Sequence, residues 1–305
     1  MQFKKKLIAI IKPIEAIKLR LNVLFQAIGY AIKSYRLTNK GQLPKYELLQ
    51  LAHRLEKGLL IEIPKPFWGW EKAYRMAYLI SINDDEFSNH TGRGVLKSYL
   101  EAKKNSDNPS EKEKAIKFEE QFPDILKEET RGGIVQMTKE KISSVQKELI
   151  EEFFKSRHSC RDYQDVLVSK DDIKVAIALA MRCPSACNRQ VTNCYVYQSK
   201  ELQTIILTAS IRAYDVGEFN DWFVSPSIFA GYLSLTLHLY GIGSCIYRKQ
   251  LYGHHEYNEL MRKKCNIPND EMIMLELRFG YYKDGFKVPV SNRYNADDVI
   301  KYIDE

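Results

Sequence analysis

Hydrophobic residues recur at steps of three and four along the first half of this 305-residue chain, which is the spacing of helices that bury one face. Such stripes run through residues 10–28 and begin again at Lys45. They resume at Phe67, after two prolines interrupt the pattern. Residues 105–129 are rich in lysine and glutamate, and predict either an exposed helix or a mobile connector. The first half is therefore predicted to be helical.

Beyond residue 150, helical and strand patterns alternate. Ser169, with Asp172 three positions later, predicts the capped start of a helix that runs through Arg182. β-Branched and aromatic residues predict a strand from Val191 to Tyr197. Strict alternation predicts another strand from Ile273 to Phe279, with one face toward the core.

A long apolar segment precedes Tyr240. Ser225 and Pro226 predict its N-cap and first-turn proline. Because this helix is apolar nearly all round, we expect it to be buried on all sides, by a sheet and, as a further candidate cover, by a second subunit. A short helix is predicted after Asn295.

The composition is that of a globular protein, with 45% apolar and 28% charged residues. Six cysteines lack paired zinc-ligand spacing, which favours a reduced, cytoplasmic setting and predicts no metal site.

The charge is unevenly placed. Residues 1–36 carry eight lysines and arginines against the single Glu15, which accounts for the whole formal net charge of +7. The longest uncharged stretch there, Leu21–Ile32, has twelve residues, whereas a membrane-spanning helix needs about twenty. Two interpretations stay open: a basic amphipathic helix on the inner face of an anionic membrane, or a helix docked on the protein. Because the surplus stops at residue 36, no nucleic-acid partner is predicted.

Two polar segments carry the candidate chemistry. In the first, basic side chains surround one hydroxyl, a donor set suited to an organic phosphate. The second is a Pro-Ser turn followed by two amide side chains, which can hydrogen-bond to the edge of a planar heterocycle. The first segment holds Arg157, His158, Ser159 and Arg161, and the second holds Pro184, Ser185, Asn188 and Gln190.

Together these segments resemble the flavin-binding signature of the nitroreductase family, over about residues 150 to 300. Weaker agreement comes from Gly241–Cys245 and from Ser291-Asn292-Arg293. The resemblance implies an α+β fold, in which an antiparallel or mixed central sheet is flanked by helices and carries a helical N-terminal extension. It also implies a homodimer with FMN at the subunit interface.

The same resemblance implies roles for individual residues. The first segment would hold the phosphate and ribityl groups, with a second phosphate contact from Arg293. Pro184, Ser185 and Asn188 would reach the flavin ring from the partner subunit, and Gln190 and Gly243 complete the predicted cofactor-binding set. No catalytic side chain is predicted, because flavin itself accepts the hydride, with NADH or NADPH as donor and a small aromatic or quinone-like acceptor.

We therefore predict a basic helix over residues 1–37, a helical extension over 38–150 and an FMN-binding domain over 151–305. Short N-terminal segments also resemble a long nitroreductase-like subgroup associated with bacterial surface-polysaccharide synthesis. A scaffold with a degenerate flavin site is the alternative function. It is favoured by Val191, where the family has an aromatic residue, and by the lack of an acidic-Gly segment after Cys245.

Overall fold

The computed structural model describes residues 43–61, 67–125, 132–134, 146–213, 218, 221–247, 255–285 and 293–303, together with five positions between 21 and 32. The basic helix predicted over residues 1–37 therefore lies almost wholly outside the described residues. The five described positions are helical and exposed: Leu21, Phe25, Ile28, Gly29 and Ile32.

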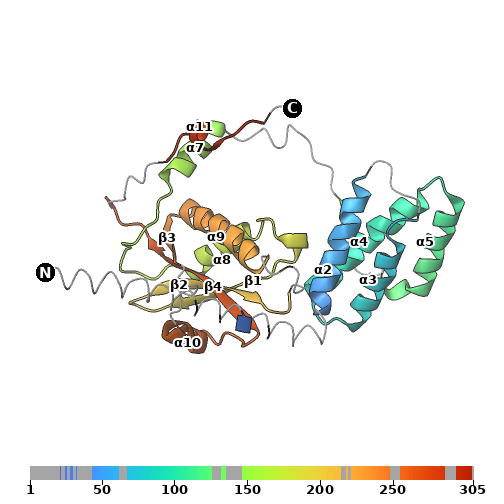
Figure 1. Cartoon of the computed structure of the whole chain (residues 1–305), viewed down its shortest axis with the longest axis horizontal. Helices are drawn as coiled ribbons and strands as arrows, with labels where there is room; N and C mark the ends of the chain where they lie inside the picture. The colour runs from blue at the N-terminus through green and yellow to red at the C-terminus, as the bar shows by residue number, and fades with distance from the viewer. Residues whose placement is uncertain are drawn as a thin grey trace.

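A four-stranded antiparallel sheet forms the centre of the C-terminal half, in the order β1-β2-β4-β3 (Figure 1). Helices α8 and α9 cover one face, and α10 covers the other. The predicted α+β class, with an antiparallel central sheet flanked by helices, is confirmed. The bounds are β1 Thr192–Gln198, β2 Gln203–Ser210, β3 Ile242–Tyr247, β4 Glu271–Tyr281, α8 Lys170–Ala180, α9 Asp221–Leu239 and α10 His255–Lys264.

The predicted helix start at Ser169 is confirmed. Its hydroxyl accepts hydrogen bonds from the backbone N–H groups of Asp171 and Asp172, as expected of an N-cap. At the other end of the domain, Asn295 closes a capping box with Asp298 at the start of the short helix α11 (Ala296–Val299).

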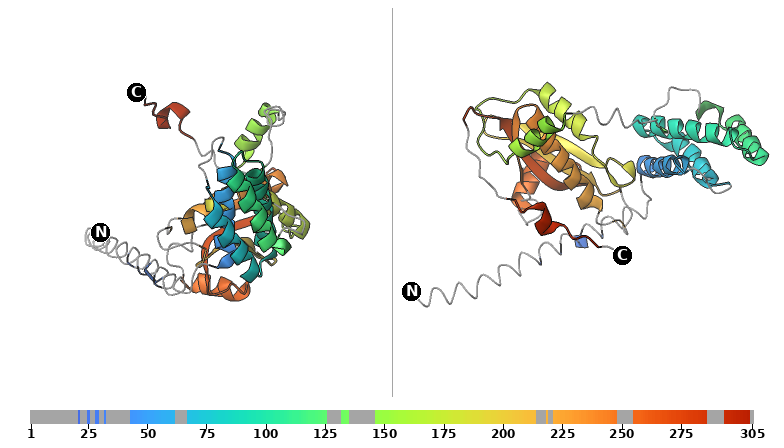
Figure 2. Two further views of the ribbon diagram at one scale, coloured as in Figure 1. Left: turned by 90° about the vertical axis from the view of Figure 1, so that its right-hand side faces the viewer. Right: turned by 90° about the horizontal axis from the view of Figure 1, so that it is seen from above.

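Four helices of the N-terminal half share a second hydrophobic core (Figure 2). The segment predicted as an exposed helix or connector forms α5, which buries Ala115 and Phe118. Tyr46 of α2 instead joins the core of the sheet, so this helix contacts both halves. The bounds are α2 Pro44–Leu59, α3 Trp70–Ile82, α4 Glu86–Lys104 and α5 Pro109–Gln121, followed by the short η1 Pro123–Ile125.

A buried ion pair joins α4 and α5. Glu111 accepts hydrogen bonds from Lys103 Nζ at 2.9 Å and from Trp70 Nε1 at 2.8 Å. It also accepts from the backbone N–H of Phe67 at 2.7 Å, which fixes the turn that leads into α3. Trp68 from this turn lies so close to α2 that a Cβ on Gly58 would fall 2.2 Å from its ring.

The predicted N-cap of α9 is wrong. The helix begins at Asp221, and Pro226 lies inside it. Burial of Trp222, which is 1% exposed, extends the helix by a turn despite the backbone hydrogen bond that a proline cannot donate. Ser225 instead accepts from the backbone N–H of Ala186 at 3.4 Å, through its hydroxyl.

One expectation about burial differs from the structure, and another is met in part. The sheet covers one side of α9, while Val224, Tyr232 and Leu239 are exposed in the single chain, where a second subunit stays the expected cover. Strand β4 buries both faces rather than one, because α10 covers the second face. Glu276 is fully buried there and accepts from Tyr257 and Thr204.

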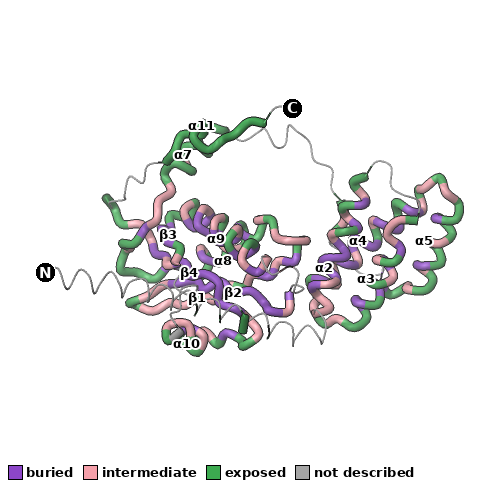
Figure 3. The backbone as a smooth tube through the Cα atoms, in the orientation of Figure 1, coloured by how far each residue is buried: buried purple, intermediate pink, exposed green. Residues whose placement is uncertain are grey.

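Two short helices project from the same side of the sheet and are mostly green, that is exposed, in the burial colouring (Figure 3). Helix α7 (Lys147–Ser156) has no buried residue, and its apolar Leu149 and Phe154 are exposed. The second is α11. Among the described residues, no helix combines the length and the apolar composition that crossing a bilayer requires.

Candidate functional site

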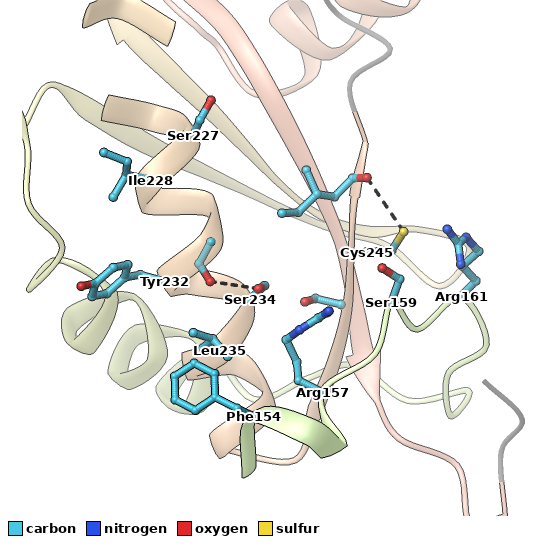
Figure 4. A pocket seen from close by; sticks show the side chains of 13 residues that line it. Phe154, Arg157, Ser159, Arg161, Ser227, Ile228, Tyr232, Ser234, Leu235 and Cys245 are labelled. Atoms are coloured by element: carbon cyan, nitrogen blue, oxygen red, sulfur yellow. Dashed lines mark hydrogen bonds between the residues drawn. The ribbon is translucent and has the colours of Figure 1, made fainter. Parts of the chain in front are cut away.

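A cavity of about 650 Å³ opens where the end of α7, the following loop, α9 and β3 meet (Figure 4). One wall is polar and cationic, and the other is mostly apolar. Its lining is Phe154, Arg157, Ser159, Arg161, Ser227, Ile228, Gly231, Tyr232, Ser234, Leu235, Ser244, Cys245 and Ile246.

The loop from Arg157 to Arg161 forms the polar wall because it is bound along β3. Ser159 pairs with Ser244 in a parallel bridge, and Cys160 N–H donates to the Ser244 carbonyl at 2.9 Å. Backbone pairing alternates side chains between two sides. The buried Cys160 accordingly points away, while Ser159 lines the cavity between the two arginines.

Gly243 permits this close approach. A Cβ at this position would lie 2.8 Å from both the Cys160 sulfur and the Tyr282 ring. Gly243 itself is buried and does not line the cavity. The structure therefore places it behind the polar wall, where it supports the loop.

The donors on the polar wall are suited to a phosphate dianion. Arg157 is half-buried, whereas Arg161 is exposed at the rim. Two guanidinium groups and one hydroxyl offer fork-shaped, charge-assisted donors to anionic oxygens. His158 turns elsewhere: its Nδ1 lies 2.9 Å from the Ser156 carbonyl oxygen, and its side chain is not in the cavity lining.

The opposite wall comes from α9. The lining residues on this helix include the apolar Ile228, Tyr232 and Leu235, one helical turn apart, and Phe154 of α7 lies at the lower end in Figure 4. Apart from the neighbouring backbone of α9 itself and the two adjacent residues, no atom lies within 4 Å of the place where a Cβ on Gly231 would stand. The cavity can therefore accept a flat apolar group on one side and an anion on the other.

A hydrogen-bonded chain fixes the end of α7 next to Arg157. Ser156 Oγ donates to the Phe153 carbonyl at 2.9 Å and lies 2.8 Å from His238 Nε2. His238 Nδ1 lies 2.9 Å from the Tyr282 hydroxyl. Since the Ser156 proton is already committed, the imidazole donates from Nε2 and accepts at Nδ1.

Electrostatic interactions favour the neutral form of the His238 imidazole in this hydrogen-bonded series. Burial, followed by the nearby Arg157 charge, lowers the pKa of His238 below its ordinary value. Burial raises the pKa of Tyr282 to about 12, so its hydroxyl stays protonated and donates.

The Pro-Ser turn lies on the other side of α9. It contains the short helix η2 (Ala186–Asn188), and its backbone is strained: Cys187, Asn188 and Gln190 have φ values of 50°, 51° and 49°. Two of the hydrogen bonds that close the turn go to Ser185. Asn188 N–H donates to the Ser185 carbonyl at 3.0 Å, and Gln190 N–H donates to the Ser185 hydroxyl at 3.1 Å.

The two predicted segments do not meet within one chain. Ser185 and Gln190 line a separate cavity of about 30 Å³ with Phe229, while Asn188 and Pro184 are exposed at the surface. Arg293 is exposed and lines neither cavity. Ser291 and Asn292 lie outside the described residues.

The sequence pattern predicted one site from Arg157, Ser159 and Arg161, and the structure places these three on one wall; the pattern missed the apolar wall. Ile228, Tyr232 and Leu235 were assigned to an all-round buried helix. Their helical spacing was visible, but only the placement of α7 and the loop shows that this face of α9 borders a cavity.

Comparison with known proteins gives one family. Residues 154–220 match the model of the nitroreductase family. No curated protein matches the chain.

Solved structures resemble about half of the chain. An FMN-dependent nitroreductase from Clostridium difficile R20291 is 21% identical, with a TM-score of 0.41 over 50% of this chain and 98% of the other. A nitroreductase with bound FMN from Desulfitobacterium hafniense DCB-2 is 17% identical, with a TM-score of 0.42 over 55% and 100%. A BluB-like flavoprotein from Clostridium difficile 630 is 14% identical, with a TM-score of 0.44 over 51% and 99%.

Proposed function

We propose that this protein is an FMN-dependent oxidoreductase, which takes electrons from NADH or NADPH and reduces a small aromatic or quinone-like acceptor. The observation that carries the proposal is the polar wall of the large cavity, where Arg157, Ser159 and Arg161 face one space. The family match over residues 154–220 supports it, because that stretch contains both the polar wall and the Pro-Ser turn.

The residues present fit this cofactor. FMN joins a phosphate dianion to a flat ring, and the cavity offers two guanidinium groups at one wall and an apolar helix at the other. We assign the phosphate to Arg157, Ser159 and Arg161, where each charge-assisted hydrogen bond is worth about 1.5–3 kcal/mol. When bound, the flavin supplies the hydride-accepting centre, so the chain has only to bind and orient the flavin and the reactants.

We further propose that the protein acts as a homodimer. Within one chain the Pro-Ser turn lies outside the large cavity, so Pro184, Ser185 and Asn188 would contact the flavin of a partner. Apolar surface is available for such contact on α9 and on α7. It is also available on residues 293–303, the C-terminal arm, where Tyr302 is 82% exposed and Ile303 90%. Arg293 begins the same arm, and we place its second phosphate contact in the dimer.

The division into residues 1–37, 38–150 and 151–305 is part of the proposal. The separate core of α2–α5 supports it. A cytoplasmic setting, a membrane contact through residues 1–36 and a role in surface-polysaccharide synthesis stay predictions, since most of the N-terminal segment lies outside the described residues.

The test is the colour and chemistry of the purified full-length protein. We expect a flavin absorption spectrum, or its appearance when FMN is added, and bleaching by NADH or NADPH under anaerobic conditions. Replacing Arg157 and Arg161 by glutamine should weaken FMN binding by at least about a hundredfold, because two charge-assisted contacts are lost. Lys174→Gln, at an exposed position of α8, is the matched control.

A folded protein that binds no FMN at any concentration would refute the proposed FMN-dependent activity. It would favour the alternative of a scaffold with a degenerate flavin site.

A further inference from the structure

Arg189 lies inside the Pro-Ser turn, between Asn188 and Gln190, yet its side chain is completely buried. Its Nη2 donates to Glu218 Oε1 at 2.9 Å. Burying a guanidinium group is costly unless it is paired and hydrogen-bonded, so this side chain must be held by well-placed acceptors.

The second acceptor comes from the helical extension. Gln50 of α2 is buried, and with its amide oxygen turned toward the arginines it accepts from Arg189 Nη2 at 2.5 Å and from Arg54 Nη2 at 3.1 Å. The hydrogen-bonding network sets that amide orientation, because oxygen and nitrogen of an amide are told apart by their partners.

Helix α2 is also anchored near this point. One turn before Gln50, Tyr46 is buried in the core of the sheet, where desolvation raises the pKa of its hydroxyl. The Gln50–Arg189 contact therefore forms between two fixed elements rather than between flexible surface groups.

The turn needs such support. Three of its non-glycine residues have left-handed backbone conformations, each of which persists only where the surroundings over-determine it. Asn188 and Gln190, on either side of Arg189, are two of the three. Because the Arg189 side chain is anchored, the backbones of Asn188 and Gln190 on either side of it are restrained.

We propose that α2 positions the Pro-Ser turn through the Gln50–Arg189 contact, so that the helical extension sets how tightly the turn engages the flavin ring of the partner subunit. Arg189 and Gln50 are positioning residues here. The flavin part of this inference rests on the proposed function, but the coupling between α2 and the turn does not.

The flavin-free protein supplies the first readout. Asn188 N–H and Gln190 N–H are both hydrogen-bonded within the turn, so their exchange with deuterium reports on its order. In Gln50→Leu, which keeps the shape and removes the acceptor, we expect exchange at these two amides to rise by about tenfold, the scale of one lost charge-assisted hydrogen bond. Gln50→Glu supplies a charged acceptor and should restore slow exchange.

The second readout is FMN binding. The dissociation constant should rise by about tenfold in Gln50→Leu and return toward the wild-type value in Gln50→Glu. Gln121→Leu, at the exposed end of α5, is the matched control and should change neither measurement. Arg189→Leu should reproduce the loss, because it removes the Nη2 that donates to both Glu218 and Gln50.

Wild-type exchange in Gln50→Leu, or equal exchange in Gln50→Leu and Gln50→Glu, would overturn the inference. Exchange that behaves as expected, in a protein that binds no FMN, would refute the proposed function and support the coupling of α2 to the turn. Normal FMN binding by Gln50→Leu, despite faster exchange, would overturn the flavin part alone.

Discussion

His238 Nε2 lies 2.8 Å from Ser156 Oγ, and the residue that follows this serine is Arg157, which lines the large cavity. The imidazole belongs to the C-terminal end of α9, whereas Ser156 ends α7. This contact therefore ties the placement of a cavity arginine to the protonation state of a histidine.

Acid should weaken this arrangement. Burial and the Arg157 charge lower the pKa of His238, so the folded chain binds fewer protons than the unfolded chain as the pH falls below the ordinary value of 6.5. The stabilisation is complete above that value and is lost as the pH drops through the lowered pKa. We expect thermal stability to fall in this window, and His238→Gln to flatten the dependence.

Gln121→Leu, at the exposed end of α5, carries no titratable group and should leave the slope unchanged. A wild-type slope in His238→Gln would show that this histidine does not carry the pH dependence.

The buried pair in the helical extension should contribute strongly to stability. Burial alone would raise the pKa of Glu111, but hydrogen bonds from Lys103, Trp70 and Phe67 outweigh it and lower that pKa. Because the folded pKa is the lower one, this contribution is present above the ordinary glutamate value of 4.5 and is lost as the pH falls through the folded value.

Glu111→Gln leaves a buried ammonium without its counter-charge, which should cost about 3–5 kcal/mol. Denaturant titration followed by tryptophan fluorescence measures the loss, since Trp68 and Trp70 surround Lys103. The exposed pair Glu113–Lys117 is the control, and Glu113→Gln should cost far less stability because solvent screens that pair. Equal losses in the two variants would contradict the prediction.

Local patterns predicted the parts of the fold that depend on neighbouring residues. The Ser169 cap and the strand from Val191 to Tyr197 are set by side chains within a few positions, and the structure has them within one residue. The start of α9 is different, because burial of Trp222 in the sheet core overrides the usual place of a proline in the first turn.

The candidate site was predictable in part for the same reason. Arg157, Ser159 and Arg161 are close in sequence and lie together on one wall. The contact between Gln50 and Arg189 joins residues that are far apart in the chain, and a buried arginine in a turn looks like any surface arginine until its partners are placed.

Two glycines near the cavity should respond oppositely to alanine. At Gly243 a Cβ would overlap with Cys160 and Tyr282, so Gly243→Ala should cost about 1–3 kcal/mol and displace the loop that carries Arg157. At Gly231, inside α9, nothing stands within 4 Å, so Gly231→Ala should stabilise the protein by roughly 0.5–1 kcal/mol through the helix backbone.

Denaturant unfolding separates the two variants, and FMN binding should weaken in Gly243→Ala. The cavity interpretation of Gly231 would be contradicted if its alanine variant were as unstable as the Gly243 variant.

The exposed apolar side chains Val224 and Leu239 of α9 should mediate self-association. Val224 is 47% exposed and Leu239 55%, although the helix is otherwise packed on the sheet, so each leaves apolar surface in water. Val224 and Leu239 lie outside the cavity lining, which makes them suitable for substitution. The double variant Val224→Glu/Leu239→Glu should shift the protein from dimer to monomer, because like charges would face each other across a twofold contact.

Sedimentation equilibrium measures the change, with Val175→Glu on α8 as an equally exposed control. If the turn of one subunit completes the flavin site of the other, the monomeric variant should also bind FMN more weakly while keeping its secondary structure. A monomeric wild type that binds FMN tightly would refute this dimer.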